Sequence, residues 1–158
     1  MSNFDPRSRL PVNALNEKLL GFKHSCQEQL KVYFDTSVVI ALADPLDAFH
    51  GHSVGFINKI GIGSNHECYV SSPLLIELGR IAKIKGSKRC FDIVNAIEDS
   101  GIQFSSTDLK EIWELPQSYL AGGALTRRHI VDLLHYAAAS SLSCSCIASW
   151  NTRRSMTR

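Results

Sequence analysis

The stretch Lys31-Val-Tyr-Phe-Asp-Thr-Ser37 decides the fold of this chain. Its first part, 31–34, is a short run rich in β-branched and aromatic side chains, which predicts a strand. The three residues that follow are of helix-capping types, and the apolar segment 38–43 predicts a short helix directly after them. Asp35 is therefore expected at the C-terminal end of the strand. A carboxylate in such an apolar setting costs desolvation free energy unless it is hydrogen-bonded, paired or bound to a metal.

Predicted helices and strands alternate after this stretch. Three more strands are predicted at about 67–70, 102–104 and 146–149. Helices are predicted at 48–60, at 73–85 with Ser72 as N-cap, at 88–99, from Thr107, and from Thr126 to about Leu142. This alternation predicts a three-layer α/β/α domain with a central, mostly parallel sheet of about four short strands. Ligands usually bind at the C-terminal ends of the strands in such sheets.

The composition is that of one globular domain. A chain of 158 residues can bury a substantial core without disulfides or a structural metal. Hydrophobic residues make up 44% and charged residues 20%, and no apolar run approaches the roughly 20 residues of a membrane span. Segment 1–11 lacks the pattern of a secretory signal, and the 5 cysteines include no Cys-x-x-Cys pair. We therefore expect a cytoplasmic protein, and the net charge of +2 is compatible with a local basic patch.

Three further polar side chains lie in apolar segments. They are Glu77 in Ser-Pro-Leu-Leu-Ile-Glu-Leu, Asp132 in Ile-Val-Asp-Leu-Leu-His, and Asn151 in Ala-Ser-Trp-Asn. Taken singly, each acid has a simpler explanation. Glu77 could pair with the arginine three residues later, Asp132 with the arginine four residues earlier on a solvated helix face, and Asp35 could cap a helix.

Taken together, the acids suggest a metal site, because strand ends and helices can bring distant carboxylates into one pocket. Two carboxylates about 4 Å apart repel each other by about 1 kcal/mol in water and by about 4 kcal/mol at an effective dielectric constant of 20. A cluster therefore requires protonation or a cation. Mg²⁺ or Mn²⁺ suits such oxygen ligands, and either ion can activate water and stabilise charge that develops on a phosphate.

Three parts of the sequence carry a family resemblance. They are Val32-Tyr-Phe-Asp-Thr-Ser-Val-Val-Ile-Ala-Leu42, Ser71-Ser-Pro-Leu-Leu-Ile-Glu-Leu-Gly-Arg80, and Asp132-Leu-Leu-His-Tyr-Ala-Ala-Ala-Ser140 followed by Ile147-Ala-Ser-Trp-Asn151. In order and spacing they resemble the PIN domain family, which includes the VapC-type toxin ribonucleases of bacterial toxin–antitoxin pairs. The resemblance covers about residues 31–151.

This resemblance implies a metal-dependent endoribonuclease. It implies that Asp35, Glu77 and Asp132 bind Mg²⁺ or Mn²⁺, and that Asn151 supports them as a fourth catalytic residue. A metal-activated water would then attack an RNA phosphodiester. The expected partners are an RNA substrate and an antitoxin that occupies the cleft; a membrane is not expected, and a homodimer is left open.

Departures from the family pattern support an alternative. Ser145 stands where many relatives have an Asp before the last strand, Arg154 stands where a His often follows Ser-Trp-Asn, and the sequence stops at Arg158, where relatives commonly continue. We therefore expect residues 31–158 to form a PIN-like domain without the last helix and strand, preceded by an N-terminal extension, 1–30, with an amphipathic helix. The alternative function is that of a catalytically impaired or truncated PIN-like binding module.

Other side chains near these motifs have two interpretations each. The basic residues between 80 and 89 could follow a phosphate backbone or form a solvated surface. Arg127 and Arg128, in a helix's first turn, could meet an anionic partner such as RNA, or Asp132. His135 could orient Asp132 or pack in the core.

Overall fold

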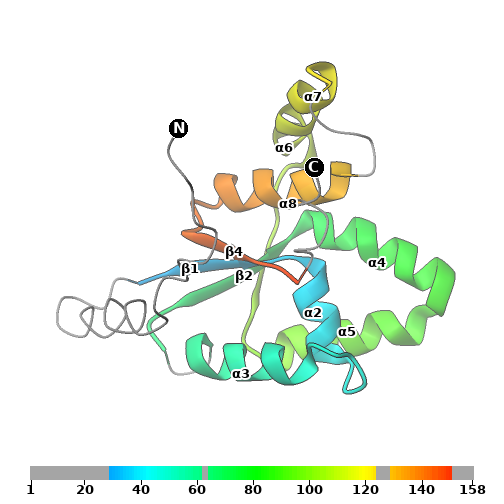
Figure 1. Ribbon diagram of the computed structural model, residues 1–158, viewed down its shortest axis with the longest axis vertical. Coiled ribbons are helices and arrows are strands. Elements are labelled where there is room, and N and C mark those ends of the chain that lie inside the picture. Colours follow the sequence, from blue (N-terminus) through cyan, green and yellow to red (C-terminus); the bar gives the residue numbers. More distant parts are fainter. Residues whose placement is uncertain (1–28, 62–63, 124–128, 151–158) are drawn as a thin grey trace, which may run out of the picture.

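The computed structural model describes residues 29–61, 64–123 and 129–150 (Figure 1). Asn151 lies outside these ranges, as do Arg127, Arg128 and residues 1–28 of the expected N-terminal extension. Within the described part, no helix combines the length and the apolar character that crossing a bilayer requires.

A parallel sheet of four strands forms the centre of the fold, in the order β3-β2-β1-β4. The strands are β1 (Lys31–Phe34), β2 (Glu67–Ser71), β3 (Gln103–Ser105) and β4 (Cys146–Ala148). Tyr33 of β1 lies opposite Tyr69 of β2 and Ile147 of β4. The predicted parallel sheet is confirmed, and the predicted ends of each strand agree with the observed ends to within one residue.

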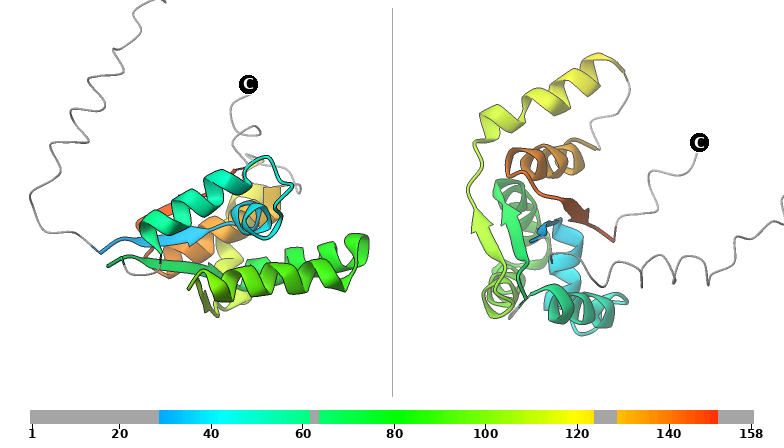
Figure 2. Two further views of the ribbon diagram at one scale, coloured as in Figure 1. Left: turned by 90° about the horizontal axis from the view of Figure 1, so that it is seen from below. Right: turned by 90° about the vertical axis from the view of Figure 1, so that its left-hand side faces the viewer.

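Helices cover both faces of the sheet, which gives three α/β/α layers (Figures 1 and 2). They are α2 (Thr36–Ala43), α3 (His50–Ile60), α4 (Ser72–Lys85), α5 (Ser87–Asp99), α6 (Leu109–Ile112), α7 (Glu114–Ala121) and α8 (Ile130–Ser141). α2, α3 and α5 lie on one face, and α8 covers the other face with α6 and α7 packed against it. α4 leaves the C-terminal end of β2 and contacts both α5 and α8, so it connects the two helical layers at that end of the sheet.

The side chains of β1 alternate between two cores. Val32 and Phe34 pack with the helices on one face, whereas Tyr33 packs with Leu134 and Ala138 of α8 on the other. All three β1 side chains are buried. Burial of a large apolar side chain stabilises the fold by about 1.5–3 kcal/mol. Packing on both faces thus fixes β1, and with it the position of Asp35, which follows the strand.

The strand order reverses beside β1. The chain passes from β1 to β2 and β3 on one side, and β4 then pairs with the other side of β1. In open α/β sheets, ligands bind in the crevice outside the C-terminal ends of the strands at such a reversal. Asp35 lies at this point, and its backbone N–H donates to the carbonyl oxygen of Ala148 over 3.1 Å.

Helices α2 to α6 start one or two residues from the predicted positions, and one contact accounts for the difference at α6 (Leu109–Ile112). Ser71 rather than Ser72 occupies the N-cap position of α4, and the Ser72 hydroxyl both donates to the carbonyl of Thr107 (2.7 Å) and accepts from its N–H (3.0 Å). Thr107 is therefore held outside the helix predicted to begin there, and α6 begins two residues later with Asp108 as its N-cap. The predicted helix start at Thr126 lies outside the described residues.

Candidate metal centre

Asp35 follows β1 directly and caps the N-terminus of α2. Its Oδ1 atom accepts hydrogen bonds from the backbone N–H groups of Ser37 (2.8 Å) and Val38 (3.3 Å), and from the Ser37 hydroxyl. A side-chain cap of this kind stabilises a helix by about 0.5–2 kcal/mol. Oδ2 takes part in none of these three contacts. The cap fixes the carboxylate through one oxygen only.

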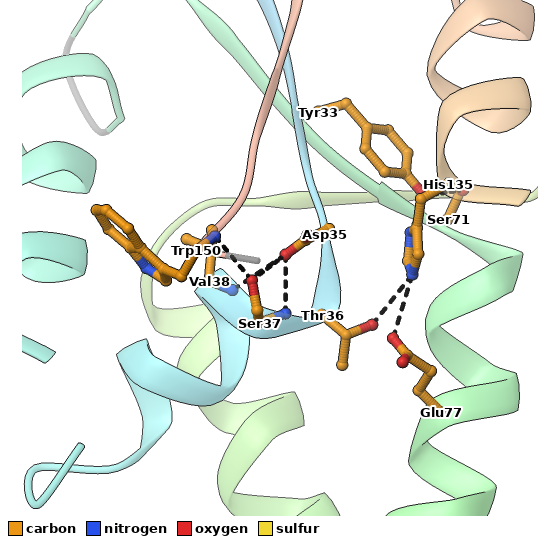
Figure 3. A network of polar contacts seen from close by, with 9 residues as sticks. All are labelled: Tyr33, Asp35, Thr36, Ser37, Val38, Ser71, Glu77, His135 and Trp150. Carbon is orange, nitrogen blue, oxygen red and sulfur yellow. Dashed lines mark hydrogen bonds and ion pairs between the residues drawn. The ribbon is translucent and has the colours of Figure 1, made fainter. Parts of the chain in front are cut away.

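Ser37 connects Asp35 to the end of β4 (Figure 3). Its hydroxyl oxygen accepts from the backbone N–H of Trp150 over 2.9 Å. The Trp150 indole is itself anchored, because its Nε1–H donates to the Ser53 hydroxyl (2.9 Å) and its ring stacks on Phe49 with centroids 5.0 Å apart. Trp150, just after β4, is therefore held in place beside Asp35 and Ser37.

Glu77 projects from α4 toward His135 and Thr36 (Figure 3). Its Oε2 atom lies 3.2 Å from Nε2 of His135, and the same nitrogen lies 3.2 Å from the Thr36 hydroxyl. Burial by itself raises the pKa of the Glu77 carboxyl. Hydrogen bonds from His135 and Thr36, together with electrostatic attraction by His135 and Arg80, outweigh burial and hold the pKa below its usual value. His135 and Thr36 are thus the direct partners of Glu77, and Arg80 acts as a nearby charge.

Asp132 lies in the first turn of α8 and is half-buried. Burial raises the pKa of its carboxyl, and the negative charges of Glu77 and Asp35 raise it further, against the smaller opposing effects of two histidines. The interpretation of this helix side as a solvated face is wrong, because His135 and Ala139 on the same side are buried.

The three acids act on one another but are not gathered around a single point. Within the described ranges, no group of three or more His, Cys, Asp or Glu side chains is arranged to hold a metal ion. One carboxylate oxygen of Asp35 (Oδ1) and one of Glu77 (Oε2) are held by hydrogen-bond donors of the protein. The chemistry of the donor set does fit a hard divalent cation, which takes carboxylate oxygens. A cation between the acids would also offset the repulsion that raises the pKa of Asp132.

Tyr33 and Ser71 extend this site into the core, and sequence reasoning missed both. The Tyr33 hydroxyl lies 2.8 Å from Nδ1 of His135 and 2.8 Å from the Ser71 hydroxyl. Strand alternation gave a signal, since it places Tyr33 on the buried face opposite its two β1 neighbours, where a tyrosine hydroxyl needs a partner. His135, predicted either to orient Asp132 or to pack, is buried but contacts Glu77 rather than Asp132.

Comparison with protein-family models identifies the domain. The model described as "PIN domain" matches residues 32–155. The chain belongs to the PIN domain family. The family predicted from the three sequence motifs is confirmed.

Solved structures of other PIN-fold proteins share its architecture. VapC20 of Mycobacterium tuberculosis, described as a toxin that cleaves the sarcin-ricin loop, has a TM-score of 0.59 and 14% sequence identity over 76% of this chain and 89% of that chain. VapBC2 from Rickettsia felis, solved with a DNA fragment from its promoter, has a TM-score of 0.52 and 15% identity over 75% of this chain and 87% of that chain. A search of curated protein sequences finds no match. At these identities the structures support the predicted three-layer fold.

Ser145 of this PIN domain does not lie among the acids. Its N–H donates to the carbonyl of Lys31 (2.7 Å), and its hydroxyl accepts from the Lys31 N–H (3.4 Å), at the start of β1. A strand rises by about 3.3 Å per residue, so Asp35 lies about 13 Å further along. Ser145 therefore lies too far from Asp35 to share a metal ion with it.

The basic residues of α4 and α5 are only partly available to an anionic partner of the PIN domain. Arg89 forms an ion pair with Asp44, and Arg80 contributes to the electrostatics of Glu77. The three lysines between them in sequence, Lys83, Lys85 and Lys88, are exposed. A continuous basic stretch from 80 to 89 is therefore reduced to a short lysine surface.

Proposed function

We propose that this PIN domain is a metal-dependent endoribonuclease that hydrolyses RNA phosphodiester bonds, and that it is the toxin of a type II toxin–antitoxin pair. One observation carries the proposal. Nε2 of His135 lies 3.2 Å both from Glu77 and from the hydroxyl of Thr36, the residue next to Asp35, and Asp132 stands three residues before His135 on α8. The three acids come from different parts of the chain. They approach one another beside the C-terminal end of β1, where parallel α/β sheets bind ligands.

In this proposal, Asp35, Glu77 and Asp132 hold Mg²⁺ or Mn²⁺, and Asn151 adds a neutral oxygen ligand. The bound ion supplies Lewis-acid chemistry, which lowers the pKa of water and offsets negative charge on the scissile phosphate. The protein keeps the acids available for this role. Thr36 and His135 favour the ionised form of Glu77, and the N-terminus of α2 holds Oδ1 of Asp35.

The test is cleavage of RNA by the purified protein in Mg²⁺ or Mn²⁺, compared with the variants Asp35→Asn and Asp132→Asn. Both variants remove a charged ligand with little change in shape. We expect each to lower the rate at least about 10–100-fold, the range seen even when an outer-shell partner of a metal ligand is changed. Chelation of the metal should stop cleavage, and cleavage that is unchanged in both variants would refute the proposed mechanism.

Glu67→Gln is the matched control for the acidic variants. Glu67 begins β2 at the opposite end of the sheet from Glu77, where it binds Lys31, Gln29 and the Tyr69 hydroxyl. It therefore reports the effect of losing one carboxylate elsewhere in the fold. Glu67→Gln should cleave RNA like the unmodified protein. If the cleavage came from a contaminating ribonuclease, preparations of all variants would cleave RNA equally.

The proposed partner is an antitoxin that covers the centre. Support comes from the toxin named in one similar structure and from the VapBC2 structure. A small open reading frame beside the gene would encode the candidate. Its product should form a stable complex with this chain and suppress cleavage, and a complex that leaves cleavage unaffected would contradict the proposed role.

A catalytically impaired binding module is the second candidate. It is favoured by the absence, among described residues, of a three-ligand group already arranged for a metal ion. Calorimetry with Mn²⁺ separates the two functions. Binding that disappears in Asp35→Asn and Asp132→Asn supports the nuclease, whereas no Mn²⁺ binding by the unmodified protein supports the binding module.

A further inference from the structure

A row of hydrogen-bonded side chains leads from the core to Glu77. It comprises Ser71, Tyr33 and His135, with Thr36 beside the last contact (Figure 3). The three oxygen and nitrogen separations from Ser71 to Tyr33, Tyr33 to His135 and His135 to Glu77 are 2.8, 2.8 and 3.2 Å. Each is within normal hydrogen-bond length.

The direction of each hydrogen bond follows from the acid at the end of the row. A Glu77 carboxylate can only accept a hydrogen bond, so in the contact of 3.2 Å Nε2 of His135 is the donor. When Nε2 carries the single proton of the His135 ring, Nδ1 is an acceptor, and the Tyr33 hydroxyl donates to it. Burial raises the pKa of Tyr33, which keeps this hydroxyl protonated. The oxygen of Tyr33 in turn accepts from Ser71. With this tautomer, all three hydrogen bonds point toward Glu77.

The row is built on rigid elements and is closed to water. Tyr33 and Ser71 are 0% exposed and His135 is 4% exposed. They come from β1, β2 and α8, whereas Glu77 comes from α4. Buried polar groups cost free energy unless all are satisfied, and when satisfied they favour one arrangement. Apolar side chains could fill the same volume, but they would remove the hydrogen-bond donor that Nε2 of His135 offers to Glu77.

We propose that Ser71, Tyr33 and His135 are positioning residues, which act through Nε2 of His135 to hold the Glu77 carboxylate in the orientation that binds the divalent cation. This inference rests on the proposed function, because it concerns the same cation. None of the three positioning residues is proposed to touch the ion. Their effect on cation affinity should resemble that of the partners which orient metal ligands in other proteins, a 10–100-fold change in affinity.

Three substitutions separate positioning from packing. His135→Leu keeps an apolar side chain in the core but removes the donor to Glu77, so Mn²⁺ affinity should fall about 10–100-fold. His135→Gln places an amide N–H near the Nε2 position and should recover most of the affinity. Tyr33→Phe removes one hydroxyl and leaves Nδ1 of His135 without its donor, so affinity should fall by up to about 10-fold.

Tyr69→Phe is the matched control. Tyr69 lies opposite Tyr33 in the sheet register and packs against the same core cluster. Its hydroxyl, however, donates to Glu67 at 2.6 Å rather than to His135. Both variants lose one tyrosine hydroxyl from the same face of the sheet, but only Tyr33→Phe interrupts the row. Mn²⁺ affinity should stay at the unmodified value in Tyr69→Phe.

The experiment is Mn²⁺ calorimetry on the full chain and these variants, with circular dichroism to establish that each is folded at the temperature used. Nitrogen-15 NMR of the unmodified protein at neutral pH, without metal, provides a second readout. We expect His135 as the Nε2–H tautomer, and finding the Nδ1–H tautomer would overturn the direction of the row. If His135→Leu does not fold, the Mn²⁺ affinities of Tyr33→Phe and His135→Gln are compared with that of Tyr69→Phe.

The outcomes distinguish this inference from the proposed function. Mn²⁺ binding that weakens in Tyr33→Phe and His135→Leu, but not in Tyr69→Phe or His135→Gln, supports positioning. If all four variants bind Mn²⁺ as tightly as the unmodified protein, the positioning role is refuted but the proposed metal site is not. No Mn²⁺ binding by the unmodified protein would overturn both.

Discussion

The backbone N–H of Trp150 and the hydroxyl oxygen of Ser37 form a hydrogen bond of 2.9 Å that joins the end of β4 to the start of α2. The same hydroxyl donates to Asp35. One serine therefore couples the first acid of the candidate centre to the residue before Asn151. Its importance follows from the burial of these groups, because a half-buried N–H without an acceptor is costly.

Ser37→Ala should destabilise the protein by about 1–3 kcal/mol, since it leaves the Trp150 N–H without its acceptor and removes one donor to Asp35. Urea unfolding followed by circular dichroism measures the change. Ser118→Ala is the control, because the exposed Ser118 hydroxyl donates to the carbonyl of Leu115 within one helix turn. A Ser37→Ala protein as stable as the control variant would contradict this account.

Asp35→Asn and Asp35→Ala should separate the capping role of Asp35 from its proposed ligand role. Asparagine keeps an oxygen that can accept from the N-terminus of α2, so the metal-free protein should lose less than about 0.5 kcal/mol, whereas alanine should lose about 0.5–2 kcal/mol. Both variants should bind Mn²⁺ at least about 10-fold more weakly. Thermal unfolding and calorimetry give the two readouts, and tight binding by Asp35→Asn would argue against a ligand role.

Asp132→Asn should stabilise the metal-free protein while it weakens cation binding. Its carboxyl is half-buried and repelled by Glu77 and Asp35, and the neutral amide removes this repulsion. Relief of such an unfavourable charge is worth about 0.5–2 kcal/mol, toward the lower end for a group that is partly solvated. Denaturant unfolding at pH 7 without metal measures it. Destabilisation by Asp132→Asn would show that the charge is favourable.

The stabilisation by Asp132→Asn should depend on pH. Because folding raises the pKa of Asp132, the folded protein resists losing this proton, and the cost develops as pH rises from the unfolded pKa through the folded pKa. Below both values the carboxyl is protonated in both states and the cost vanishes. The difference in stability between Asp132→Asn and the unmodified protein should therefore shrink toward zero at about pH 3. A difference that is constant from pH 3 to pH 7 would exclude this cause.

Thr107 offers a stabilising substitution away from the centre. Among the described residues, its hydroxyl is the only buried side-chain oxygen or nitrogen without a hydrogen-bond partner. Thr107→Val removes that hydroxyl and should leave stability unchanged or raise it by about 1 kcal/mol. Ser72→Ala should instead cost about 1–3 kcal/mol, because the Thr107 N–H loses its acceptor. Unfolding of the two variants under one set of conditions compares them directly.

The sheet could be predicted because its signals are local. The β-branched and aromatic run at 31–34 and the helix-capping type of Asp35 both depend on neighbouring residues, and both predictions agree with the structure. The start of α6 could not be predicted in the same way. It depends on Ser72, which lies 35 residues earlier and binds the backbone of Thr107.

The three acids of the candidate site could be picked out from the sequence. The side chains that form hydrogen bonds around them could not. Asp35, Glu77 and Asp132 stand out because carboxylates are unexpected in apolar segments. His135 and Tyr33 look like ordinary core residues in the sequence, and their contact spans 102 positions. Only the packing of α8 on β1 shows that the partner of His135 is Glu77 rather than Asp132.

The hydrogen bond between Ser37 and Trp150 also spans 113 positions, which has a consequence for how the protein is made. Contacts between such distant residues form late, because the long loop must close before they can contribute. During synthesis, β1 emerges early, but β4 and Trp150 emerge only after the intervening helices. A nascent chain that has not reached Trp150 therefore lacks the final surroundings of Asp35. The candidate centre is completed after translation of the domain rather than during it.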